Sequence, residues 1–285
     1  MKLFFKVCQQ YYSTPYIYAA AIMFFFLCLF GLSANVDGEF CSVFELLINP
    51  TLMAKAQQNI ECNAYMLLLN YSASPWFAVV LPIISAFPAL MIYSNYIEPL
   101  KLFILSRTNI NQYCASTTAA AFLSGAMVSV MGAALYAVLL YKVFPSFSLY
   151  ESSFFLNAYG ESPIDRFSLF CKQLSSNILI CGVLAVVAIV LYCVTEDRFL
   201  SLTLPVMAMY LSMKLSMLFS QWLFEDLERY NNKLLKGLYI LFPSNMSNAY
   251  YIFDELNIPY YLWFVFIVVI LCGLGSLFKR LGTRI

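Results

Sequence analysis

Hydrophobic residues gather into long runs along this chain, and charged residues fall almost entirely in the gaps between them. A run of about 20 mostly apolar residues is long enough to cross the hydrocarbon core of a bilayer as a helix. Because lipid offers no hydrogen-bond partners, a spanning backbone must satisfy its own N–H and C=O groups, as a helix does. The runs predict six spanning helices: Tyr16–Leu32, Trp76–Tyr93, Ala115–Tyr141, Ile178–Val194, Phe199–Trp222 and Pro259–Phe278.

The fold class follows from this pattern: an all-α, polytopic membrane protein in which residues 1–285 form one transmembrane domain. Composition agrees, since 62% of the residues are hydrophobic and only 11% are charged, against about 25% charged residues in a soluble domain. No region holds enough polar sequence for a separate soluble catalytic domain. The net charge of +1 gives no indication of nucleic-acid binding.

Lysine and arginine predict the orientation, because they are enriched in the cytoplasmic loops of membrane proteins. The outer segments, about 33–75, 142–172 and 223–258, then hold most of the acidic residues. An even number of spans places both termini inside, in agreement with the basic C-terminal tail. The inner basic residues are Lys2, Lys6, Lys101, Arg107, Arg198, Lys279, Arg280 and Arg284.

Residues 1–15 precede the first span and are not apolar enough to cross a membrane themselves. Leu3, Val7 and Tyr11 recur at helical spacing, with polar residues around the rest of the helix. This spacing predicts an amphipathic helix in the inner membrane interface, followed by a corner at Pro15. A frayed tail is the alternative.

The gap between the second and third predicted spans predicts a short helix over residues 97–107. Ser94 or Asn95 can cap its start, and Pro99 suits a first helical turn, where a missing N–H costs nothing. After the helix, Asn109 or Asn111 can cap the third span. The sequence thus predicts a separate helix on the inner side of the membrane.

This short helix is largely apolar. Leu102, Phe103 and Leu105 supply its apolar surface, and Glu98 and Lys101 are spaced for an i,i+3 ion pair. An apolar helix outside the bilayer core has to be covered by something, either lipid headgroups or a partner protein.

Small residues recur at every fourth position of the third span, a pattern that lets membrane helices approach closely. We expect a packing face there, used either within the chain or against a second membrane subunit. Its residues are Thr117, Ala121, Gly125, Ser129 and Ala133.

The fifth span is the least lipid-like and combines methionines and serines with one lysine. Adaptable methionines beside hydroxyls suit a path for an amphiphilic cargo, although ordinary packing is the alternative. For the lysine three readings are open: it faces a cavity, extends outward to the membrane surface, or forms an internal ion pair. The candidate path consists of Met209, Ser212, Met213, Lys214, Ser216 and Met217.

Missing residue types exclude several kinds of chemistry. The chain has no histidine, which removes Ser-His-Asp catalysis and histidine-ligated zinc. It also lacks the G-x-x-x-x-G-K-[ST] loop that holds ATP phosphates. The nine cysteines include no C-x-x-C pair; Cys41 and Cys62 are a candidate disulfide, with unbonded small hydrophobic residues as the alternative. We predict that the chain is not an enzyme and binds no metal or cofactor itself.

The stretch from the second into the third span resembles the permease of ABC transporters of the type 2 exporter class, especially peptide and drug exporters of Gram-positive bacteria. Members have a proline-containing second span, then a cytoplasmic segment with an acid, a lysine and an arginine, then a tyrosine and a glycine-bearing third span. Ser116 departs from this pattern, because a basic residue is expected after the tyrosine. The matching residues are Pro82 and Pro88 in LPIISAFPAL, Glu98, Lys101, Arg107 in ILSR, Tyr113, and Gly125 in LSGAMVS.

The resemblance implies that two six-span permeases, identical or different, pair in the bacterial cytoplasmic membrane with two separate ABC ATPase subunits that hold ATP and Mg. It implies export of a hydrophobic or amphiphilic cargo such as a peptide, a drug or a lipid-like molecule. The alternatives are a secondary transporter or channel subunit, or a non-catalytic membrane scaffold. A secondary transporter would be favoured by acidic residues within the spans or by an internal repeat, and the sequence has neither. The residues implied to dock on the ATPase are Glu98, Lys101, Leu102, Phe103, Leu105 and Arg107.

Overall fold

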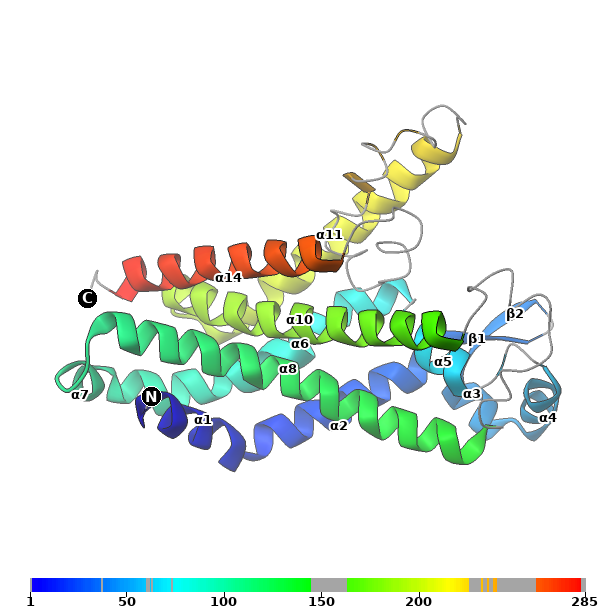
Figure 1. Cartoon of the computed structure of the whole chain (residues 1–285), viewed down its shortest axis with the longest axis horizontal. Helices are drawn as coiled ribbons and strands as arrows, with labels where there is room; N and C mark the ends of the chain where they lie inside the picture. The colour runs from blue at the N-terminus through cyan, green and yellow to red at the C-terminus, as the bar shows by residue number, and fades with distance from the viewer. Residues whose placement is uncertain are drawn as a thin grey trace.

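The computed structural model of the chain describes residues 2–36, 38–59, 62, 64–72, 74–144, 163–225, 232, 235, 238–239 and 260–282. Its long helices lie side by side in one elongated bundle (Figure 1). The elements are α1 (Lys2–Ser13), α2 (Pro15–Phe30), β1 (Leu32–Val36), β2 (Glu39–Ser42), α3 (Val43–Ile48), α4 (Pro50–Gln58), α5 (Ala64–Asn70), α6 (Pro75–Ile92), the π-helical turn η2 (Tyr93–Ile97), the 3-10 turn η3 (Glu98–Leu100), α7 (Lys101–Leu105), α8 (Ile110–Val143), α10 (Pro163–Thr195), α11 (Arg198–Phe224) and α14 (Tyr260–Gly282).

Four helical runs in the described part of the chain are long and apolar enough to cross a membrane. α1 and α2 make a fifth candidate if they are taken as one span bent by 59°. The sixth predicted span falls on the 23 residues of α14, except for Pro259, which lies outside the described residues. The described part of the chain is therefore helical, with four to five helices that can span a membrane. The four runs are Trp76–Leu105, Ile110–Val143, Cys171–Thr195 and Arg198–Leu223.

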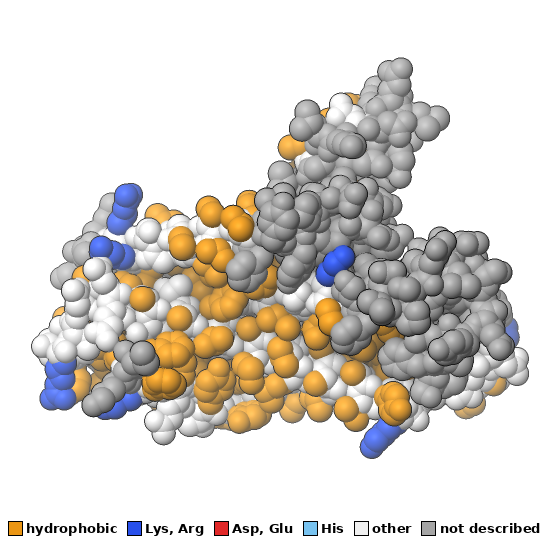
Figure 2. All heavy atoms as spheres, viewed as in Figure 1, with side chains coloured by type: hydrophobic (Ala, Val, Ile, Leu, Met, Phe, Trp, Pro, Cys, Tyr) orange, Lys and Arg blue, Asp and Glu red, His pale blue; other side chains and the backbone are white. Residues whose placement is uncertain are grey.

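The two ends of the bundle differ in what they carry. α7 and both ends of the chain lie at the same end (Figure 1). Hydrophobic side chains cover the middle of the viewed face, and lysine and arginine side chains lie mostly toward its ends (Figure 2). The segments predicted to be inner thus share one end of the bundle. Much of the predicted outer segments, 142–172 and 223–258, lies outside the described residues.

The predicted N-terminal helix is present as α1. Thr14 then adopts an extended conformation and Pro15 opens α2, so the predicted corner is confirmed. Val7 and Tyr11 on the apolar face are buried, and α1 contacts α8. The face predicted to lie in the membrane interface therefore packs on the protein itself.

The first outer loop contains a β-hairpin that the all-α prediction omits. β1 and β2 pair antiparallel, with Leu32 opposite Ser42 and Val36 opposite Glu39. Gly38 in the turn has a φ of 89°, a conformation open to glycine at little cost. Ser42 then caps α3, which turns the chain back toward the bundle. The hairpin lies at the end of the bundle opposite α7 (Figure 1).

α8 lies at the centre of the bundle and contacts α1, α2, α6, α10 and α14. All five members of its predicted small-residue face are buried. A Cβ added at Gly125 would come within 2.8 Å of the Ala185 Cβ and would clash with the Cys181 carbonyl of α10. One at Gly132 would come within 2.8 Å of the Phe24 Cβ in α2. The small residues of α8 thus pack within the chain.

Candidate functional site

The predicted short helix over 97–107 is not a separate element. α6, η2, η3 and α7 form one helical run, Trp76–Leu105, and neither Ser94 nor Asn95 caps a new helix start. Pro99 explains the change of helix type, because it has no N–H to donate. The Glu98 N–H donates to the Tyr93 carbonyl in a π-type bond, and the Lys101 N–H donates to the Glu98 carbonyl in a 3-10 bond. The two bonds bridge the proline without ending the helix.

This run is longer than a membrane requires. Its 30 residues would measure ~45 Å at helical rise, whereas the hydrocarbon core is about 30 Å thick. The exposed apolar side chains gather at its far end, where Leu102 is 76% and Phe103 is 55% exposed. We call Leu100, Leu102, Phe103 and Arg107 the tip. All four side chains are exposed to solvent in the isolated chain.

Local hydrogen bonds hold the tip in shape. The Ser106 Oγ donates to the Phe103 carbonyl at 2.8 Å, and the Thr108 Oγ1 donates to the Ile104 carbonyl at 2.7 Å. Asn109 then caps α8, its Oδ1 accepting from the Asn111 N–H at 3.2 Å. Of the two predicted caps, Asn109 is therefore the one used.

Arg107 folds back over the tip. Its guanidinium carbon lies 4.0 Å from the centroid of the Phe103 ring. A guanidinium over an aromatic face is attracted by the ring quadrupole, by about 0.5–1 kcal/mol at an exposed site. The pair presents a planar aromatic and a positive charge together on one exposed surface.

Glu98 ties the base of the tip to α10. Its Oε2 accepts a hydrogen bond from the Tyr192 hydroxyl at 2.7 Å. The predicted Glu98–Lys101 ion pair does not form in the described structure. The Glu98 carboxylate accepts from Tyr192 of α10 instead.

An aromatic cluster lies beneath the tip and joins four helical segments. The Tyr93 ring meets the Tyr192 and Phe278 rings edge to face, each at 6.0 Å between centroids. Tyr113 stacks on Phe278 at 6.2 Å, and the Tyr93 hydroxyl lies 3.5 Å from the Cys193 Sγ. The helical run that carries the tip thus contacts α10 and α14 here, and Phe278 of α14 contacts α8 in turn.

α8 and α14 leave a groove between them, of about 660 Å³. Its walls are mostly small or apolar, and Ala119, Leu123 and Leu271 are among them. Asn111 and Lys279 bring polar groups to the α7 end of the groove. This site was not predicted from the sequence, although Gly275, Ser276 and Lys279 near the end of the last apolar run were its signal. We call this space the groove.

The candidate cargo path on α11 divides between two faces. Met209, Ser212, Met213 and Ser216 are buried, whereas Met217 and Lys214 are exposed. The Lys214 Nζ lies 5.7 Å from the centroid of the Tyr210 ring. Lys214 thus lies on the surface of the chain, on a face that other parts of the described bundle leave uncovered.

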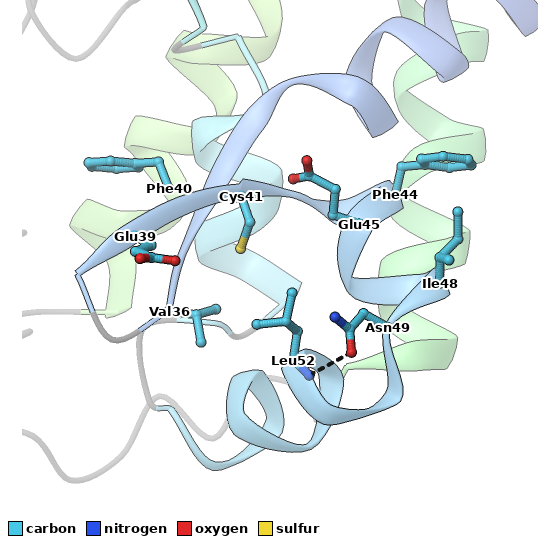
Figure 3. Close-up of a pocket in the computed structure, with 9 residues that line it drawn as sticks. All are labelled: Val36, Glu39, Phe40, Cys41, Phe44, Glu45, Ile48, Asn49 and Leu52. Carbon is cyan, nitrogen blue, oxygen red and sulfur yellow. Dashed lines mark hydrogen bonds between the residues drawn. The ribbon is translucent and has the colours of Figure 1, made fainter.

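A second hollow, of about 400 Å³, lies between the hairpin and α3–α4 (Figure 3). Cys41 points into it, with a free thiol, so a Cys41–Cys62 disulfide is not formed. Burial raises the pKa of the Cys41 thiol, and the carboxylates of Glu45 and Glu39 raise it further. Glu45 is already used by the fold, since its Oε2 accepts from the Ser42 N–H at 2.7 Å. A protonated thiol is a weak nucleophile, so this hollow gives no reactive site.

Within the described ranges, no group of three or more histidine, cysteine, aspartate or glutamate side chains could hold a metal ion. Comparison with protein-family models, with curated proteins and with solved structures gave no match to this chain.

Proposed function

We propose that this chain is the membrane-spanning subunit of an ATP-driven ABC exporter in the bacterial cytoplasmic membrane. The observation that carries the proposal is the tip: a helical run that is too long for the bilayer and ends in exposed apolar side chains beside a cation. Such a surface needs a partner. The partner in this proposal is a separate ATPase subunit, which holds ATP and Mg.

The composition of the tip suits a protein interface. Aromatic residues and arginine are enriched where binding energy concentrates in such interfaces. Phe103 and Arg107 provide one of each, already stacked, so little side-chain freedom is lost on docking. Leu100 and Leu102 add exposed apolar area around them. In this arrangement the ATPase offers an apolar pocket for Phe103 and an acidic rim for Arg107.

Six spans with both termini inside complete the proposed topology. α2 forms the first span, with α1 at the inner membrane interface; α14 forms the sixth, and α7 projects on the inner side. The gathering of both ends of the chain at the α7 end of the bundle supports this orientation (Figure 1). So does the Lys279–Arg280 pair in the last turn of α14, because basic residues favour the cytoplasmic side.

Transmission from the ATPase to the spans follows from the contacts beneath the tip. Closure of the paired ATPases on ATP pushes α7, and the Glu98–Tyr192 hydrogen bond carries this movement to α10. The Tyr93–Phe278 contact carries it to α14. Packed side chains of this kind can adopt discrete alternative arrangements, which a push at one end can exchange.

A second permease and the cargo are assigned to the open side of α11. Only 28% of the apolar stretch of α11 is buried inside the chain, whereas 78% of the apolar stretch of Trp76–Leu105 is buried. α11 also leans away from the bundle at its C-terminal end (Figure 1). Lys214 lies on this uncovered side. A hydrophobic or amphiphilic cargo would pass between two such faces, one from each permease.

Co-purification with a separately encoded ABC ATPase tests the proposal. The double variant Phe103→Asp, Arg107→Glu should lose at least about 90% of the bound ATPase. A loss of about 1.4 kcal/mol of binding free energy is enough, because it lowers affinity about tenfold. Phe199→Asp and Lys6→Glu are matched controls, because both residues are exposed and lie outside the tip. Unchanged ATPase binding by the double variant, or labelling of residues 97–107 from outside the cell, would refute the coupling role.

A further inference from the structure

The groove between α8 and α14 has unfilled space beside Gly275 of α14. Gly275 lines it, and a Cβ added there would meet nothing within 4 Å. Leu123 and Leu271 stand among its apolar walls. A membrane protein with such an open lateral groove offers it to the surrounding lipid, because lipid is the solvent at that depth.

The α7 end of the groove is electropositive. Lys279 lines it, and the ammonium groups of both Lys279 and Lys101 lie within electrostatic range of the Cys114 thiol on its wall. Neither lysine forms an ion pair in the described part of the chain. The carboxylate of Glu98, in η3, accepts a hydrogen bond from Tyr192. One cation, Lys279, thus lines the apolar groove, and a second, Lys101, lies within electrostatic range of its wall.

The start of α8 adds to this field. Asn111 lines the groove and lies in the first turn of a 34-residue helix. The first turn of a helix carries a partial positive charge from its unpaired N–H groups. The Asn111 side-chain amide also supplies hydrogen-bond donors there.

We propose that this groove binds an anionic phospholipid from the leaflet at the α7 end. One acyl chain lies between Leu123 and Leu271, and the phosphate lies at Lys279 with Lys101 nearby. Basic pockets between membrane helices bind anionic headgroups in this way, and the volume of about 660 Å³ falls in the usual range for ligand sites. The proposal does not depend on the ATPase, because it uses this chain alone.

Charge complementarity favours a lipid over a second copy of the chain. The residues at the α7 end include Lys6, Arg107 and Arg280, so a second copy in the same orientation would bring like charges to Lys279. An anionic phospholipid brings the opposite charge and an apolar chain in one molecule. Its phosphate would sit at the depth where the lysines lie.

The test uses the full chain reconstituted in nanodiscs of equal phosphatidylglycerol and phosphatidylcholine, released into the gas phase for native mass spectrometry. The wild-type chain should retain phosphatidylglycerol in preference to phosphatidylcholine. Lys279→Gln should reduce this preference about fivefold, the effect of one lysine near an anionic surface. Gly275→Leu should fill the groove and remove most retention of both lipids.

Matched controls separate the groove from the rest of the surface. Gly273→Leu adds the same side chain on the same helix, also with nothing within 4 Å, but does not line the groove. Lys6→Gln removes an exposed lysine outside the groove. Both should retain lipid as the wild type does.

Three results would overturn the proposal. Lys279→Gln and Gly275→Leu could both match the wild type. Phosphatidylcholine could be retained as strongly as phosphatidylglycerol, which would make the occupant an uncharged amphiphile. A dimer of the chain could be lost in Gly275→Leu, which would make the occupant a second copy. Circular dichroism of each variant confirms that the helices are intact.

Discussion

The two sides of α8 carry similarly small residues but meet their neighbours very differently. On one side, Gly125 contacts α10 and Gly132 contacts α2, without room for a methyl group; we call these contacts the seam. On the other side, Ala115 and Ala119 line the groove, and Gly275 of α14 faces open space. Small residues therefore permit close approach but do not enforce it. What the facing helix carries decides whether the space closes.

Reciprocal shape closes the seam. Gly182 of α10 receives the Phe122 ring of α8, while Gly125 of α8 receives the α10 backbone. Each helix thus fills the hollow of the other, without a charged side chain in these contacts. In the groove, by contrast, Lys279 stands at one end. A lysine must keep its ammonium group hydrated or paired, so the helices cannot close over it as they do at the seam.

Filling the seam should have the largest effect. Gly125→Val places branched carbons against the Cys181 carbonyl and the Ala185 side chain, and it should destabilise the chain by about 3 kcal/mol. Gly275→Val is the matched change in the groove, where the same carbons meet nothing. Equilibrium unfolding in mixed micelles with increasing SDS, followed by circular dichroism, measures both. Equal stability of the two variants would show that the seam is not packed as described.

A single methyl group should change the free energy of unfolding in opposite directions in the seam and on the open surface of α14. Gly132→Ala brings a Cβ within 2.9 Å of the Ala21 carbonyl oxygen, and it should cost about 2 kcal/mol. Gly273→Ala adds a methyl in open space, where alanine favours a helix over glycine by up to about 1 kcal/mol. The free energy of unfolding, measured by the same assay, should therefore fall in Gly132→Ala and rise in Gly273→Ala. Stabilisation by Gly132→Ala would contradict the close contact with α2.

The contrast between the two sides also marks what sequence can predict. The lengths of the helices were predictable, because lipid demands long apolar runs: Ala115–Tyr141 falls within α8, and Phe199–Trp222 within α11. Local caps were partly predictable, as Asn109 shows. The hairpin was not, because Leu32–Val36 and Glu39–Ser42 are short and lie where an apolar run ends, without a clear alternation of apolar and polar residues.

The candidate sites were predictable to different degrees. The apolar, exposed character of Leu102 and Phe103 followed from their place in a gap between spans. The Glu98–Tyr192 bond did not, because the two residues are 94 positions apart and meet only through tertiary packing. The groove needed α8 and α14 in contact, which no local pattern specifies. Function at the level of an ATP-driven exporter stays a prediction, and so does the role of Lys214.

Removal of one buried hydrogen bond should have the smallest of these effects on the free energy of unfolding. At the hairpin end of α10, the Asn177 Nδ2 donates to the Tyr71 hydroxyl at 2.7 Å, and both residues are buried. Tyr71→Phe removes this acceptor and keeps the ring, so it should destabilise the chain by about 1 kcal/mol. Tyr18→Phe is the control, because Tyr18 is 52% exposed on α2. Removal of its hydroxyl therefore leaves no buried partner without a hydrogen bond. The SDS unfolding assay resolves this difference when the two variants are measured side by side. If Tyr71→Phe were as stable as the wild type while Gly125→Val was not, the close packing of α8 on α10 would stabilise the chain, and the hydrogen bond between α10 and the α5–α6 loop would contribute nothing.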